Sequence, residues 1–94
     1  MNIPYFLKST QEMLFQAFPK GVSEEYYWIL IYLLYDYLAD ENLAIVMSSV
    51  TGKPIEIISN DIYKVNQVTL DKEKIQEVEF QLDLYGFEEW KKND

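Results

Sequence analysis

The feature that most constrains the fold is the stretch from Phe18 to Leu38, which reads FPKGVSEEYYWILIYLLYDYL. Ser23 is placed to cap a helix that continues to the end of this stretch. The helix is apolar or aromatic on nearly every side, because only Glu25 and Asp36 mark a polar side, with Ile29 between them. A helix of this kind is either the central helix of a bundle or part of an interface.

Four further helices are predicted from apolar residues that recur at spacings of three and four. They cover approximately residues 4–18, 41–50, 58–65 and 72–85. Asp40 and Asp71 are expected to cap the third and fifth helices, since a carboxylate can accept hydrogen bonds from free N–H groups of a first turn. Only the segment 55–58 is ambiguous, because its β-branched residues also suit an extended strand.

Short polar connections join the helices, and no repeat or linker suggests a second domain. We therefore predict a single helical domain over residues 1–94, an all-α compact bundle of about five short helices. After the last helix, Phe87 and Trp90 are expected to fold back onto the bundle. The third and fourth helices, joined by Thr51-Gly52-Lys53-Pro54, suggest helix-turn-helix-like packing. DNA binding is not predicted, because the second of them carries one lysine and no arginine.

The residue types narrow the chemistry. The sequence has no cysteine and no histidine, which excludes a disulfide framework, a thiol nucleophile, a typical zinc site and a histidine-dependent triad. Carboxylates, lysines and tyrosines remain, but the acidic residues lie at helix starts or on the polar face of the last helix, where capping and solvation explain them. We predict that the protein is not an enzyme and uses no metal or cofactor.

Charge and hydropathy indicate the environment of the chain. Sixteen acidic and eight basic residues give a net charge of −8, which opposes direct contact with nucleic acid or with anionic lipid. The longest apolar run, Tyr26 to Tyr35, is about half of the roughly 20 residues that a membrane-spanning helix needs. Residues 1–20 lack the pattern of a signal peptide. The predicted location is the cytoplasm, without membrane association.

A set of motifs in order along the chain resembles a small bacterial family, the domain-of-unknown-function family 3349, which is known chiefly from actinobacteria. The matching residues are Phe18-Pro19-Lys20-Gly21-Val22, Tyr27, Leu30, Leu33, Leu34, Leu38, Asp40-Glu41, Leu43, Val46, Asp61-Ile62, Val68-Thr69, Val78, Leu82, Gly86 and Phe87. The resemblance implies a small bundle of short helices. It implies no activity, so no catalytic residue is carried over from the family.

Two departures from the family pattern lie in the second helix. Ser23 stands where the family commonly has proline at the helix start. Tyr35, Asp36 and Tyr37 stand where it often has basic residues. A family function that used positive charge at this helix end is therefore not expected here.

An aromatic stripe on the second helix is the candidate protein interface. Trp28, Tyr32 and Tyr35 cannot easily share the face that carries the core leucines, and aromatic residues are enriched at protein interfaces. Phe87 or Trp90 is expected to lie beside them. Two interpretations stay open, since either the first and fifth helices or a protein partner could cover this stripe.

The sequence therefore predicts a non-enzymatic protein–protein interaction module or homodimer. The alternative is an acidic inhibitor or nucleic-acid mimic, of the immunity or antirepressor type, that binds a basic protein surface. Small size and a net charge of −8 motivate this alternative.

Overall fold

Residues 3–92, described by a computed structural model, contain helices and turns and no β-strand. Two short 3₁₀-helices accompany six α-helices in this range. In chain order they are η1 (Tyr5–Leu7), α1 (Lys8–Ala17), α2 (Glu24–Leu34), α3 (Asp40–Thr51), α4 (Ile55–Lys64), η2 (Val65–Gln67), α5 (Lys72–Asp83) and α6 (Phe87–Lys92). The prediction of an all-α bundle is confirmed.

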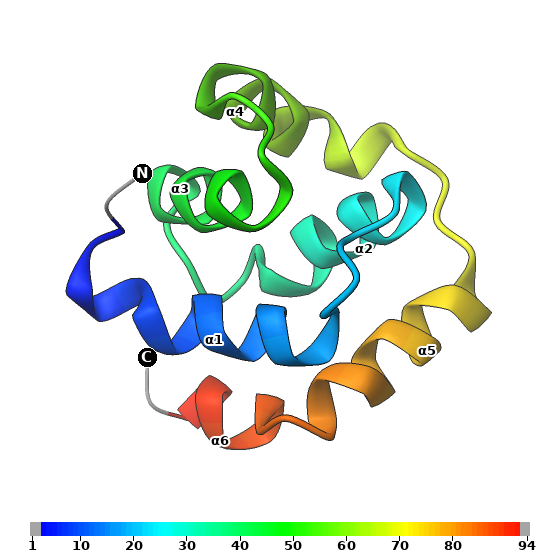
Figure 1. Cartoon of the computed structure of the whole chain (residues 1–94). Helices are drawn as coiled ribbons and strands as arrows, with labels where there is room; N and C mark the ends of the chain where they lie inside the picture. The colour runs from blue at the N-terminus through cyan, green and yellow to red at the C-terminus, as the bar shows by residue number, and fades with distance from the viewer. Residues whose placement is uncertain (1–2, 93–94) are drawn as a thin grey trace.

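The helices pack around a shared interior rather than in parallel layers (Figure 1). α3 packs against α4, α2 against α5, and α1 against α3, α5 and α6, so the first and last helices are neighbours. The bundle measures 33 × 30 × 25 Å, with a radius of gyration of 12.2 Å. These dimensions are those of a compact domain of this length.

α2 supplies the centre of the hydrophobic core. Its fully buried side chains are Tyr27, Ile29, Leu30, Ile31 and Leu34. The burial of Ile29 corrects the expectation that this residue lies on a polar side of the helix. α2 contacts both η2 and α5, so it has neighbours on more than one side. The apolar side of α2 is thereby buried in the core, whereas Glu24, Glu25 and Tyr32 remain exposed.

The beginnings of the helices follow local sequence in two of three predicted cases. The Ser23 hydroxyl accepts a hydrogen bond from the backbone N–H of Tyr26 at 3.2 Å, as predicted. Asp71 accepts one from the N–H of Glu73 at 2.8 Å, also as predicted. The prediction for Asp40 is wrong, because Ala39 occupies the cap position of α3 and Asp40 lies inside the first turn. There its negative charge still suits the helix dipole.

The connection between α3 and α4 explains why the segment 55–58, which could have been helical or extended, is helical. Gly52 ends α3 with φ of 80°, a left-handed conformation that side chains resist, and the Ser48 hydroxyl donates to the Lys53 carbonyl at 2.7 Å. Pro54 then occupies the cap position of α4, so the helix begins at Ile55 rather than near residue 58. Proline fixes a backbone angle that suits entry into a helix, and the segment 55–58 is helical throughout.

The two largest differences from prediction concern helix ends. α2 stops at Leu34, and residues 35–37 form a turn in which the Tyr37 N–H donates to the Leu34 carbonyl at 3.0 Å. The predicted helix through Leu38 is therefore too long. Near the other end of the chain, Gly86 has φ of 93° and separates α5 from α6, a sixth helix where only folded-back residues were expected.

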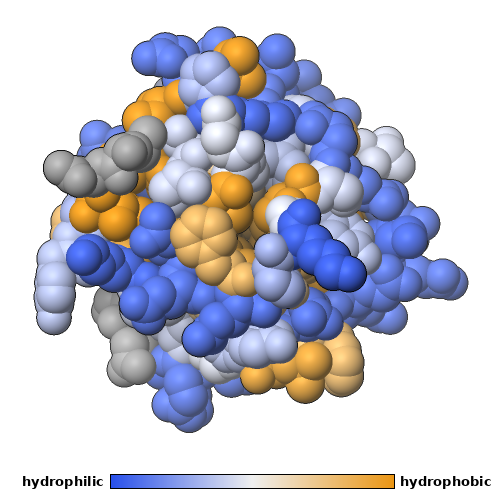
Figure 2. All heavy atoms as spheres, in the orientation of Figure 1, coloured by the Kyte–Doolittle hydropathy of each residue, from blue (hydrophilic) through white to orange (hydrophobic). Residues whose placement is uncertain are grey.

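The face of the molecule seen in Figure 2 is mostly hydrophilic, with several separate hydrophobic areas rather than one continuous patch. Within residues 3–92, none of the helices has the length and apolar character required to cross a bilayer.

Candidate functional site

The predicted aromatic stripe is divided between the interior and the surface. Trp28 is half-buried, lies edge-on to the Tyr27 ring at 5.5 Å between centroids, and borders a small cavity that is also lined by residues 68–71. Tyr32 and Tyr35 are 48% and 41% exposed. Residues of the same chain therefore cover much of Trp28, while both tyrosines present their rings to solvent.

Phe87 does not belong to the exposed surface. Its side chain is 1% exposed, stacks on Trp90 at 5.7 Å between ring centroids, and meets the Tyr37 ring edge-on at 6.3 Å. Trp90 is half-buried, and its indole N–H donates to the hydroxyl of buried Thr10 at 2.8 Å. Both residues fold back onto the bundle as predicted. They hold α6 against α1 and do not extend the exposed stripe. Burial of the two aromatic rings stabilises this packing of a short helix.

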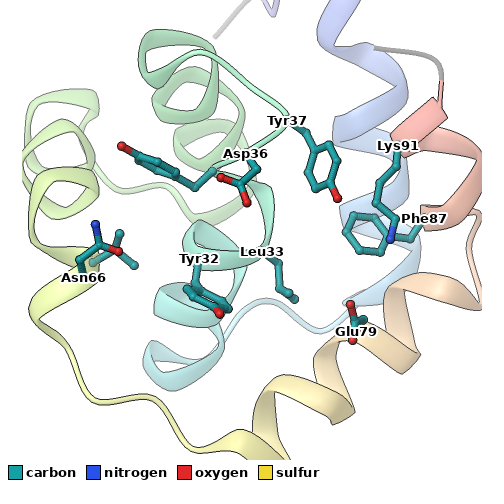
Figure 3. A pocket seen from close by; sticks show the side chains of 10 residues that line it. Tyr32, Leu33, Asp36, Tyr37, Asn66, Glu79, Phe87 and Lys91 are labelled. Carbon is teal, nitrogen blue, oxygen red and sulfur yellow. The ribbon is translucent and has the colours of Figure 1, made fainter.

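Tyr32 and Tyr35 lie at the edge of a groove with a volume of about 490 Å³. Figure 3 shows how α2, the turn after it, η2, α5 and α6 surround this space. The lining residues are Tyr32, Leu33, Tyr35, Asp36, Tyr37, Val65, Asn66, Glu79, Phe87 and Lys91. The size lies in the range typical of ligand-binding clefts.

Sequence reasoning missed most of this groove. A helix continued through Leu38 does not predict that Tyr37 contacts the end of the chain, whereas the turn at residues 35–37 directs its ring toward α6. The sequence pattern identifies Asp36 only as a residue on the polar side of the helix. Glu79 and Lys91 could not be associated with α2 from local pattern, because tertiary packing alone brings their helices to it.

The charged groups at the groove are predominantly acidic. Asp36 is exposed and Glu79 half-buried, and neither forms an ion pair with any lysine in the described range 3–92. Lys91 is the cation in the lining, and its ammonium lies 3.0 Å from Glu88 and 4.7 Å from the centre of the Phe87 ring. The hydrogen bond to Glu88 raises the pKa of Lys91, and the charges of Glu88 and nearby Asp83 raise it further.

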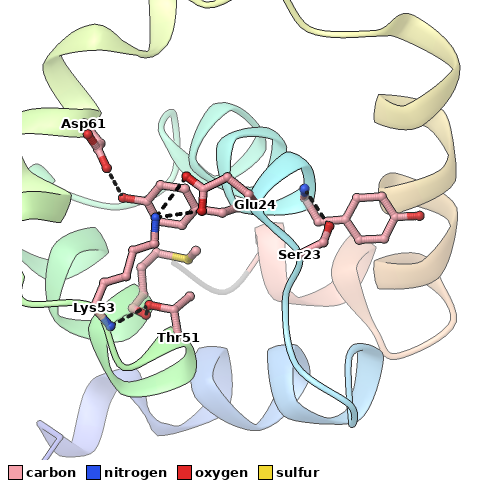
Figure 4. Close-up of polar contacts among 8 residues, drawn as sticks. Ser23, Glu24, Thr51, Lys53 and Asp61 are labelled. Carbon is pink, nitrogen blue, oxygen red and sulfur yellow. Dashed lines mark hydrogen bonds and ion pairs between the residues drawn. The ribbon is translucent and has the colours of Figure 1, made fainter.

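A polar cluster around Tyr27 lies elsewhere on α2 (Figure 4). The Tyr27 hydroxyl donates to the Asp61 carboxylate at 2.6 Å, and the Lys53 ammonium lies 3.8 Å from the centre of the same ring. Lys53 also pairs with Glu24 at 2.9 Å. Burial of the phenol raises the pKa of Tyr27 well above its usual value, and the hydrogen bond and charge of Asp61 add to the rise. Tyr27 is therefore held as a protonated donor, and the cluster joins α2 to α4 and to the turn before it.

A second groove, of about 470 Å³, lies on the other side of Tyr37. Its lining includes Phe6, Met13, Leu38, Tyr85 and Trp90 from η1, α1, the turn after α2, the α5–α6 junction and α6. Its lining contains no charged side chain, unlike that of the groove beside Tyr32.

No group of three or more carboxylates within residues 3–92 is arranged to hold a metal ion. Comparisons with protein-family models, with curated proteins and with solved structures found no significant match. The resemblance to family 3349 therefore stays a prediction.

Proposed function

We propose that this chain acts by binding another protein through the surface formed by Tyr32, Tyr35 and the adjoining groove. The observation that supports the proposal is the pair of half-exposed tyrosines, three residues apart at the C-terminal end of α2, a helix that buries Tyr27, Ile29, Leu30, Ile31 and Leu34 in the core. Rings mounted on a rigid element lose little conformational entropy when a partner covers them. Tyrosine is also among the residues that dominate binding energy at protein interfaces. The proposed role is non-enzymatic.

The proposed partner is a different protein rather than a second copy of this chain. Each copy carries a net charge of −8, so two copies repel one another, and the carboxylates at the groove add to that repulsion. A partner with a basic surface would instead be attracted by the negative charge of this chain, which chiefly raises the rate of association.

An acidic inhibitor that mimics nucleic acid is the second candidate. It would need carboxylates spread as a continuous array resembling phosphates. On α5 and α6, however, Lys74 lies 3.7 Å from Glu77 and Lys91 lies 3.0 Å from Glu88, so lysines interrupt the carboxylates there. This arrangement favours a partner that binds in one groove over a partner that binds an extended acidic surface.

Site-specific photo-crosslinking in cells of the natural host tests the proposal. Tyr32 would be replaced by p-benzoylphenylalanine, with the same replacement at Tyr63 as the matched control. Tyr63 lies on α4, is 78% exposed and does not line the groove. We expect a discrete adduct with a second protein from position 32 that is absent from position 63 and is lost when Tyr35→Glu is added.

Equal labelling from the two positions would contradict the proposal. An adduct between two copies of the chain, together with a dimer in sedimentation analysis, would replace the heterologous partner by self-association.

A further inference from the structure

We infer that the groove beside Tyr32 receives an arginine side chain presented by a basic segment of the protein partner. The inference rests on the proposed function and specifies what the partner must offer. It comes from two properties that coincide in the groove, its aromatic walls and its unpaired carboxylates.

The aromatic walls suit a flat cation. Tyr32, Tyr35 and Tyr37 all line the groove, and a tyrosine ring attracts a guanidinium or ammonium group placed over its face. Arginine suits such walls better than lysine, because its planar and weakly hydrated guanidinium stacks on rings while its N–H groups remain free to donate. Tyr37 is fixed in place by edge-on contacts with Phe87 and Trp90, so this part of the wall is formed before a partner arrives.

The carboxylates provide the charge that an arginine would pair with. Glu79 reaches toward the groove from α5, and Asp36 lies on the turn after α2 (Figure 3). Since neither forms an ion pair with a lysine of the described chain, a guanidinium in the groove would be their first cationic partner. The lining contains two carboxylates and one lysine, Lys91. The charge of Lys91 is already balanced by Glu88, which lies 3.0 Å from its ammonium.

Other occupants fit less well. A phosphorylated or otherwise anionic ligand would meet Asp36, Glu79 and a molecule with a net charge of −8. An apolar helix would find better cover in the second groove, whose lining has no charged side chain. The groove beside Tyr32 is thus matched to a cation on a polypeptide.

Titration with two short peptides, followed by nuclear magnetic resonance, tests the inference on the full chain. The first is acetyl-Gly-Gly-Arg-Gly-Gly-amide, and the second carries citrulline, which has the same shape without the charge, in place of arginine. At low salt we expect the arginine peptide to cause saturable shifts at residues 32–37, 79 and 87–91, with a dissociation constant in the millimolar range. The citrulline peptide should bind at least about fivefold more weakly than the arginine peptide, because it cannot form the charge-assisted contact.

Two variants localise the effect, and one serves as a control. Glu79→Gln and Tyr32→Leu should each weaken binding of the arginine peptide by about two- to fivefold. Glu12→Gln makes the same change of charge on an exposed part of α1 outside the groove, and should leave the affinity unchanged. Because all three positions are at least partly exposed, the variants are expected to fold.

Equal binding of the two peptides, shifts outside the groove, or equal effects of Glu79→Gln and Glu12→Gln would overturn the inference. The proposed function would stand in that event if Tyr32 still crosslinked a protein partner. Loss of that crosslink alone would overturn the proposed function, so the two failures are distinguishable.

Discussion

At the scale of single residues, Tyr27 combines burial of its ring with a hydrogen bond to a carboxylate. It is 1% exposed, yet its hydroxyl donates to Asp61 at 2.6 Å and Lys53 lies over its ring. Glu24, which pairs with Lys53, adds a further negative charge nearby. A phenol in these surroundings resists ionisation, because its anion would be both desolvated and close to carboxylates. The buried ring is thereby a source of pH dependence in a protein without histidine.

We predict that Tyr27→Phe lowers the free energy of unfolding by about 1.5 kcal/mol at pH 8, since a hydrogen bond to a charged acceptor is lost. Well below pH 10, the usual tyrosine pKa, both folded and unfolded chains keep this proton. Above that pH the unfolded chain releases it first, so the wild type loses stability as pH rises. The variant should lose less between pH 8 and 11.

Urea unfolding followed by circular dichroism at the two pH values measures both effects. Tyr63→Phe is the control, because Tyr63 is largely exposed on α4. The prediction fails if Tyr27→Phe shows the same stability loss with pH as Tyr63→Phe.

At the scale of secondary structure elements, α6 shows how a short helix can be held by its side chains. Six residues are too few for a helix to be stable alone in water. Phe87 is fully buried, and Trp90 both stacks on it and donates to Thr10 on α1. Burial of these rings, rather than helix propensity, therefore keeps α6 folded.

We predict that Phe87→Ala destabilises the protein by about 3 kcal/mol or more, because it leaves a cavity where a buried ring stood. Phe80→Ala on α5 removes the same group from an exposed position and should cost well under 1 kcal/mol. Urea midpoints of the two variants give the comparison. Similar midpoints would show that α6 contributes little to the core.

The elements also show what sequence can and cannot specify. The caps at Ser23 and Asp71 were predictable, because a cap involves residues two or three apart. The end of α2 was not, since Tyr37 leaves the helical pattern to contact Phe87 and Trp90, which are distant in sequence. The groove was missed for the same reason, because its walls come from four separate parts of the chain. Only the exposure of Tyr32 and Tyr35 was foreseen, as one of two interpretations.

At the scale of the whole molecule, the excess of negative charge acts on every part of the surface. Sixteen carboxylates and eight lysines share a body 33 × 30 × 25 Å across, and three ion pairs join the two signs within residues 3–92. At about 0.01 M salt the screening length is roughly 30 Å, so charges on opposite sides still repel one another. Near 1 M it falls to about 3 Å.

We therefore predict that added sodium chloride stabilises the protein. Between about 0.01 and 0.5 M salt, the midpoint of thermal unfolding should rise by about 5 °C, equivalent to about 1 kcal/mol in a domain of this size. Glu12→Lys, an exposed charge reversal on α1, should raise the midpoint at low salt and flatten its salt dependence. A midpoint that falls with salt would mean that the three ion pairs outweigh the general repulsion.

The hydrogen bond between Thr10 and Trp90 joins residues that are 80 positions apart in the chain. This bond holds α6 beside α1, so the last helix that the structure describes packs against the beginning of the bundle (Figure 1). The packing of the helices therefore joins segments that lie far apart in the order of synthesis. A circular permutant that connects Lys92 to Ile3 through a flexible linker and is opened at a surface turn would keep the same core and the same groove.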